Sequence, residues 1–324
     1  MLVVATVGMT FGAGISRAET DSYLETARPG FTEYNGVKVA YYEFGPAADK
    51  APTVLYTGGW PWGSDVLEPG VKELTHRYHV VRYDTRGAGA SDHPTEQSAY
   101  TLENLAGEFN AVVDAVAPGR KVHAFGEGLA AFTIGEYAHE FPGRLLSIST
   151  FGAPSLDMAV NAMRRDAQDP STYPRLAVQI AALSYVGILG TPNIPEMAFA
   201  TGIPTIAVNA FTDIISDRLN DLFTTNLGNE PTNAYDSAAG LNRYSAAFLP
   251  GLLGPTHYDY LDVPEVSVIQ LSGDFIESDI LIDGLETRTP HLVLRYTTGN
   301  HFPPNYQLVR EAVDQAIADT EPNP

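Results

Sequence analysis

The chain has 324 residues, of which 44% are hydrophobic and 10% aromatic, and acidic residues outnumber basic residues by 39 to 19. This composition supports a sizeable buried core and argues against an intrinsically disordered chain. The formal charge of −20 argues against nucleic acid and anionic membrane surfaces as partners, because both attract lysine and arginine. No cysteine is present, which excludes disulfides, thiolate metal sites and a catalytic thiol.

Residues 1–18 differ from the rest of the chain. The run Leu2–Ser16 is apolar and uncharged, and the small-x-small pattern at Ser16–Ala18 is typical of a signal-peptidase site. The run is shorter than the roughly 20 residues that a membrane-spanning helix needs, and no basic residue precedes it. We therefore interpret residues 1–18 as a signal or a disordered segment. A signal implies a secreted or periplasmic protein; otherwise we expect a cytoplasmic one, without an integral membrane domain.

Strand and helix patterns alternate over residues 32–154. Short runs rich in β-branched and aromatic residues predict strands at Val37–Glu43, Thr53–Thr57, His79–Tyr83, Val122–Phe125 and Leu145–Thr150. Helical spacing of apolar residues predicts helices at Leu102–Val116, with Thr101 as its N-cap, and at Leu129–Phe141. This alternation predicts an α/β fold with a mostly parallel central sheet and helices on both faces.

The pattern changes at residues 155–257. Helical stretches at Tyr173–Leu189 and Ile206–Leu222 are separated by prolines and glycines, which predicts a mainly helical cap inserted into the sheet. Strand patterns return at Val266–Leu271 and Leu292–Tyr296, and a final helix is expected at Gln307–Ala318. Residues 258–322 thus complete the core that residues 32–154 begin.

Ligands of such sheets bind at the carboxyl ends of the strands, so the turns after the predicted strands indicate the chemistry. These turns are Gly58-Gly59-Trp60-Pro61, Asp84-Thr85-Arg86-Gly87-Ala88-Gly89-Ala90-Ser91, Gly126-Glu127-Gly128-Leu129-Ala130, Ser272-Gly273-Asp274 and Gly299-Asn300-His301-Phe302. Through them the chain resembles the α/β-hydrolase fold superfamily, and within it the epoxide-hydrolase-like group. The resemblance covers about residues 32–154 and 258–320, and more weakly the cap between them.

The resemblance implies a catalytic histidine at His301 and its acid partner at Asp274, with Asp279 as a rival acid. It also implies that the backbone N–H groups of Trp60 and Leu129 form the oxyanion hole. Gly58 replaces the histidine that the family has in the first of these turns. In the resembled group, lid tyrosines polarise an epoxide oxygen. Six tyrosines in or near the cap could correspond to them: Tyr173, Tyr185, Tyr235, Tyr244, Tyr258 and Tyr260.

The nucleophile position departs from the family pattern. A nucleophile elbow has small residues two before and two after its nucleophile; Gly126 and Ala130 fit, so the slot falls on Gly128, which has no side chain. An elbow shifted to Glu127 is disfavoured, because it would place Leu129 where a small residue is needed. Glu127 is therefore either a repurposed acid or base with a raised pKa, or a solvated glutamate at the start of a helix.

Two functions remain open. The first is an enzyme in which the His301–Asp274 dyad acts as a general base without a covalent nucleophile, on a small, fairly apolar lactone, epoxide, ester or enolisable ketone. The alternative is a catalytically inactive pseudoenzyme that binds a ligand or a partner. In both cases we expect a small-molecule ligand and no cofactor or metal, because no phosphate-binding or metal motif is visible. The oligomeric state is left open.

Overall fold

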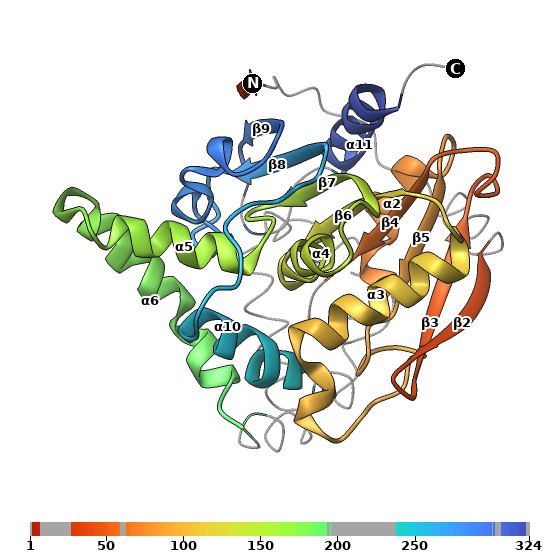
Figure 1. The fold of residues 1–324 in the computed structure, drawn as a ribbon, viewed down its shortest axis with the longest axis horizontal. Coiled ribbons are helices and arrows are strands. Elements are labelled where there is room, and N and C mark those ends of the chain that lie inside the picture. Colours follow the sequence, from red (N-terminus) through yellow and green to blue (C-terminus); the bar gives the residue numbers. More distant parts are fainter. Residues whose placement is uncertain are drawn as a thin grey trace, which may run out of the picture.

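The structure is a computed structural model, and it describes residues 2–6, 27–58, 63–192, 195, 238–299, 301 and 306–321. Within this part of the chain, nine strands form one sheet in the order β1-β9-β8-β7-β6-β4-β5-β3-β2 (Figure 1). The strands are β1 (Leu2–Thr6), β2 (Arg28–Tyr34), β3 (Val37–Phe44), β4 (Thr53–Thr57), β5 (His79–Tyr83), β6 (Val122–Glu127), β7 (Leu145–Phe151), β8 (Glu265–Leu271) and β9 (Leu292–Thr297).

Most neighbouring strands run parallel, and β2 and β3 form an antiparallel edge. Every residue of β4, β5 and β8 is buried, as expected for strands covered on both faces. The parallel register places the carboxyl ends of β4, β6, β7, β8 and β9 along one edge of the sheet. The predicted turns therefore meet at that edge.

Helices cover both faces of the sheet (Figure 1). The α-helices are α2 (Glu68–Leu74), α3 (Leu102–Val116), α4 (Leu129–Glu140), α5 (Leu156–Asp166), α6 (Tyr173–Leu189), α10 (Leu249–Leu253) and α11 (Gln307–Thr320). The shorter turns are η1 (Ser64–Leu67), η2 (Gln97–Tyr100), η3 (Pro170–Thr172), η5 (Tyr244–Phe248), η6 (Asp279–Ile282) and η7 (Leu285–Thr287). Apolar side chains of α3 and α4 belong to one core cluster, and those of α2 and α11 to a second.

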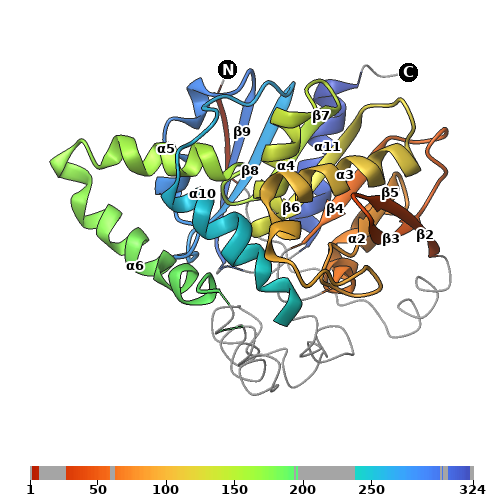
Figure 2. The ribbon, with the colours of Figure 1, turned by 60° about the horizontal axis from the view of Figure 1, so that its bottom comes forward.

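The chain between β7 and β8 contains α5, α6, η5 and α10, which Figure 2 shows together on the side away from β2 and β3. The N-cap of α5 is Ser155, whose hydroxyl accepts a hydrogen bond from the N–H of Met158. The ring of Phe248 stacks on that of Phe132 in α4, with centroids 5.3 Å apart, so this helical segment packs against the helix that follows β6. The predicted helix Ile206–Leu222 lies outside the described residues.

The N-terminal part contains two strands that the sequence does not predict. Residues 2–6 form β1, which pairs in parallel with β9 at one end of the sheet, and Arg28–Tyr34 form β2 at the other. Cleavage of the N-terminal segment stays a prediction. In the part of the chain that the structure describes, no helix combines the length and apolar character needed to cross a membrane.

Candidate active site

The turn between β6 and α4 has the backbone of a nucleophile elbow. Gly128 has φ 57° and ψ −129°, a conformation that favours glycine and is costly for other residues. A Cβ atom at Gly126 would lie 2.6 Å from Cδ1 of Ile134 and 2.9 Å from the backbone nitrogen of Ala131, so this position must remain small. At the centre of the elbow, Gly128 therefore has a hydrogen atom where a nucleophilic side chain would otherwise be attached.

His301 and Asp274 are paired across two neighbouring strand ends. Nδ1 of His301 lies 2.9 Å from Oδ2 of Asp274. The other oxygen of Asp274 accepts hydrogen bonds from the N–H groups of Ile276 and Glu277, at 2.9 and 3.0 Å. Asp279, the rival acid, is exposed on η6. The structure thus brings together the pair that the sequence singles out.

The surrounding charges fix the protonation preference of this pair. Burial opposes the charged form of His301, but the charge and hydrogen bond of Asp274, together with Glu277 and Glu127, raise the pKa of His301 to about 9. Burial likewise opposes ionisation of Asp274, but His301 and the two backbone donors hold its pKa below the usual value. The resting pair is therefore an imidazolium against a carboxylate at neutral pH.

Glu277 is a site residue that the sequence analysis missed. Its side chain is 6% exposed, and a Cβ atom built on Gly128 would lie 3.9 Å from its Oε1. Burial raises the pKa of Glu277 to about 8, against the lowering effect of the charge of His301. The carboxylate thus lies between the dyad and the elbow. In the sequence, only its position three residues after Asp274 indicates that Glu277 belongs to the site. That position is informative only once the turn held by the Asp274 carboxylate is seen.

Glu127 is held by a neighbouring strand. The hydroxyl of Tyr56 in β4 donates a short hydrogen bond to Oε1 of Glu127, and the Tyr56 ring packs edge-on against Phe125 at 5.0 Å. Glu127 also lies close enough to His301 to raise the pKa of the imidazole. The carboxylate is consequently an oriented member of the charge cluster rather than a freely solvated one.

Two of the six cap tyrosines reach this cluster. Tyr185 of α6 and Tyr244 of η5 meet edge to face with centroids 6.1 Å apart, and their hydroxyls are hydrogen-bonded. Burial and the charge of Glu277 both raise the pKa of each hydroxyl, to about 12 for Tyr244, so both are protonated donors at neutral pH. Tyr258 instead stacks on His139.

The remaining cap tyrosines lie elsewhere. Tyr173 and Tyr260 are about half exposed, and Tyr235 lies outside the described residues. The structure describes one of the two expected oxyanion donors. Leu129 is the first residue of α4, directly after the elbow, whereas Trp60 falls outside the described part of the chain.

The turn after β5, residues 84–91, is held by buried hydrogen bonds and an ion pair. Asp84 accepts hydrogen bonds from the backbone N–H and hydroxyl of Ser64, at 2.9 and 2.6 Å, and from the N–H of Ala90 at 2.9 Å. Nε of Arg86 donates to Oε2 of Glu108 at 2.7 Å, and both side chains are almost completely buried. These residues hold the turn after β5 in place.

An apolar cavity lies beside the elbow helix and beneath the helical segment. Its lining includes Leu102, Leu105, Leu129, Phe132, Leu156 and Phe248. One cation, Arg243, also lines it and donates from Nη1 to the hydroxyl of Thr85 at 2.8 Å. The cavity adjoins the elbow through Leu129 and the turn after β4 through Gly58. It offers a small, mainly apolar binding space next to the elbow.

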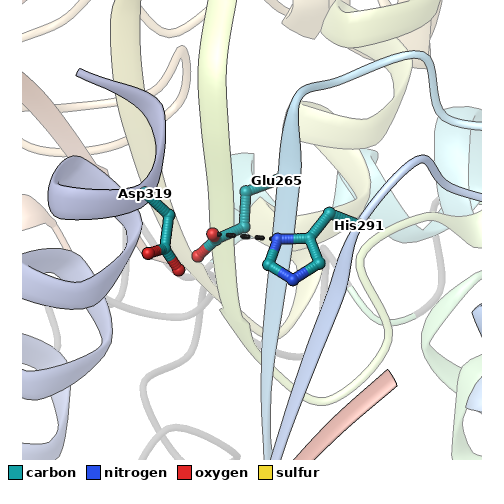
Figure 3. Close-up of side chains that lie close together, drawn as sticks. All are labelled: Glu265, His291 and Asp319. Carbon is teal, nitrogen blue, oxygen red and sulfur yellow. Dashed lines mark ion pairs between the residues drawn. The ribbon is translucent and has the colours of Figure 1, made fainter. Parts of the chain in front are cut away.

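A separate cluster of ligand-type side chains lies at the opposite edge of the sheet. Glu265 opens β8, His291 precedes β9, and Asp319 is near the end of α11 (Figure 3). One potential ligand atom from each lies within 4.8 Å of the others, the spacing of a possible metal site. Nδ1 of His291 is 3.3 Å from Oε2 of Glu265. Because this cluster is at the amino ends of the strands, it takes no part in the elbow site.

A family model for the alpha/beta hydrolase fold matches residues 52–181, which include β4 to β7 of the sheet. The chain has the α/β-hydrolase fold. A Bacillus megaterium epoxide hydrolase structure with an inhibitor superposes with a TM-score of 0.68 at 17% identity, covering 89% of this chain and 99% of that one. A Vigna radiata epoxide hydrolase mutant gives 0.64 at 19% identity, covering 91% and 98%.

Curated proteins are similar to this chain at the sequence level. The Mycobacterium tuberculosis protein named "Probable oxidoreductase EphD" is 29% identical over 297 residues, which are 88% of this chain and 48% of EphD. Epoxide hydrolase 1 of Caenorhabditis elegans is 26% identical over 133 residues, 40% of this chain and 32% of that protein. The chain spans about half the length, or less, of the curated relatives it matches. These similarities are to proteins that include epoxide hydrolases, and at these identities the structural ones show the fold.

Proposed function

We propose that the protein opens small, apolar epoxides with water, using His301 as a general base oriented by Asp274. The observation that supports the proposal is that the charge of Asp274, which pairs with His301, also raises the pKa of Tyr185, the partner of Tyr244. A strained three-membered ether needs a proton donor at its oxygen and a base that deprotonates water. The two pairs supply these groups at one site, while lactones and esters have no need of paired phenols.

The chemistry follows from the protonation states. The hydroxyl of Tyr185 or Tyr244 donates to the epoxide oxygen and protonates it as the C–O bond breaks. His301, in its neutral form, removes a proton from water, and Asp274 stabilises the imidazolium that results. The apolar cavity beside the elbow excludes water from the rest of the substrate. No residue of the elbow itself supplies an attacking atom.

The test is turnover of a panel of apolar epoxides, such as styrene oxide and 1,2-epoxyhexane, measured as diol formation. We expect His301→Gln to lower kcat for diol formation by about 10²–10⁴-fold, the usual contribution of a positioned acid–base group. His76→Gln, at an exposed position, is the matched control and should leave the rate unchanged.

The second candidate function is a ligand-binding protein, which the missing side chain at Gly128 favours. It predicts that wild type turns over no epoxide in the panel, while the same compounds still raise the melting temperature. That combination of results would overturn the proposed hydrolase.

A further inference from the structure

A carboxylate from another loop lies in front of the empty elbow. Apart from the residues adjacent to Gly128 in the chain, the described atom within 4 Å of a Cβ built on Gly128 is Oε1 of Glu277, at 3.9 Å. In the resembled group an elbow side chain would extend from that Cβ into the same space. A longer side chain from the turn after β8 therefore reaches toward the place that the glycine leaves open.

Glu277 is buried with few hydrogen-bond partners. A backbone hydrogen bond from Ala153 lowers the pKa of the carboxyl, but Oε2 is buried and accepts no hydrogen bond from any residue that the structure describes. Leaving a buried polar group without a partner costs about 1–3 kcal/mol, and more for a charge. Gly152, at φ 72°, makes room for it, because any Cβ there would collide with the carboxylate. The backbone accommodates the acid, yet one of its oxygens is left unsatisfied.

The neighbours of Glu277 are the groups that a covalent mechanism requires. The charge of His301 lowers the pKa of Glu277. The charge of Glu277 raises the pKa of the hydroxyls of Tyr185 and Tyr244. A nucleophile needs a base that can later activate water and a donor for the leaving oxygen, and Glu277 interacts electrostatically with groups of both kinds.

We infer that Glu277 is the nucleophile of this enzyme and takes the role of the absent elbow side chain. The inference rests on the proposed epoxide opening and replaces the expectation of a reaction without a covalent step. The attacking atom would then belong to the loop after β8, which also carries Asp274, rather than to the elbow between β6 and α4.

The reaction then has two balanced steps. In its ionised form, which predominates above its pKa of about 8, Glu277 bonds through one oxygen to an epoxide carbon. The C–O bond breaks, and a tyrosine hydroxyl protonates the alkoxide, which gives a glycol monoester on Glu277. His301 then deprotonates water, which attacks the ester carbonyl carbon and releases the diol. The proton returns from His301 to the tyrosinate through solvent, and epoxide plus water has become diol.

A single-turnover reaction in H₂¹⁸O separates the two mechanisms. With enzyme in excess over epoxide, attack by Glu277 gives a diol without ¹⁸O, and one ¹⁸O appears in the peptide that contains Glu277. Direct attack by water gives a diol with ¹⁸O and an unlabelled peptide, which would overturn the role of Glu277 but retain the proposed function. Absence of diol would instead overturn the proposed function itself.

Trapping gives an independent readout. His301→Gln should still form the ester and fail to hydrolyse it, so peptide mass spectrometry should find the mass of one intact epoxide on Glu277. Glu277→Gln in the same background should show no adduct, whereas Glu286→Gln, at an exposed acid, should keep it. An adduct on Glu127, or no adduct on a folded His301→Gln protein that binds epoxide, would contradict the inference.

Discussion

Three carboxylates act on the imidazole of His301 at the site. Asp274 contributes its charge and a hydrogen bond, and Glu277 and Glu127 contribute their charges. Each stabilises the imidazolium, so together they outweigh the burial that favours the neutral ring. The dyad is therefore a strong base that is mostly protonated at neutral pH, and its activity depends on how much of it has lost the proton.

The pH profile of kcat follows from this pKa when the step that needs the base limits turnover. Because His301 deprotonates water only when it is neutral, we expect kcat to rise about tenfold per pH unit from about pH 6 and to level off near the His301 pKa of about 9. Glu127→Gln removes a charge that raises this pKa, so its rising limb should move to lower pH. A profile that is flat over this range, or unmoved by Glu127→Gln, would contradict this assignment.

The residues of the site differ in how far the sequence predicts them. His301 and Asp274 follow adjacent parallel strands, so strand order alone brings them to one edge. Glu277 escapes prediction because its position depends on a turn held by Asp274 and on the space beside Gly128 and Gly152, segments that are distant in sequence. Such contacts arise from packing and leave no periodic signal along the chain.

At the scale of elements, central strands are predicted well and edge strands are not. The predicted bounds Thr53–Thr57, His79–Tyr83 and Leu102–Val116 agree with β4, β5 and α3. These elements carry clear apolar patterns because they are buried against the core. The strand β2 contains Pro29-Gly30 and is mostly exposed, so sheet pairing rather than residue preference makes it a strand.

The cluster that joins β8, β9 and α11 makes stability depend on pH. Burial, then the neighbouring Asp319, raises the pKa of Glu265 from 4.5 to about 7 in the folded chain. The folded state therefore binds a proton more tightly than the unfolded state, and stability falls as pH rises from about 4.5 to about 7. Glu265→Gln should remove this loss and raise the free energy of unfolding at pH 8 by up to about 3 kcal/mol.

Denaturant unfolding at about pH 4 and pH 8 tests this expectation. The two proteins should differ little at the lower pH, where Glu265 is protonated in both states. Glu286→Gln, on the exposed turn η7, is the matched control and should change stability by less than about 0.5 kcal/mol at either pH. Lower stability of Glu265→Gln at pH 8 would show instead that the ionised carboxylate stabilises the fold, as it would with a bound cation.

At the scale of the whole molecule, the chain combines a formal charge of −20 with a mainly apolar cavity. A field of this size lowers the local concentration of anions and leaves neutral molecules unaffected. Arg243 is the cation among the cavity residues named above, and its pKa is lowered by burial. The long-range field therefore opposes anionic substrates on their way to the site, which agrees with a small, uncharged epoxide as the preferred substrate.

This field has a measurable signature in the salt dependence of turnover. We compare an epoxide that carries a carboxylate with its methyl ester, from about 10 mM to about 200 mM NaCl, a range over which the Debye length falls from about 30 Å to below 10 Å. For the carboxylate, kcat/KM should rise several-fold as salt screens the repulsion, whereas for the ester it should stay constant. A kcat/KM that falls with salt for the carboxylate alone would mean that a local cation such as Arg243 outweighs the net charge. Arg243→Met would then abolish that fall and identify the residue that recognises the anion.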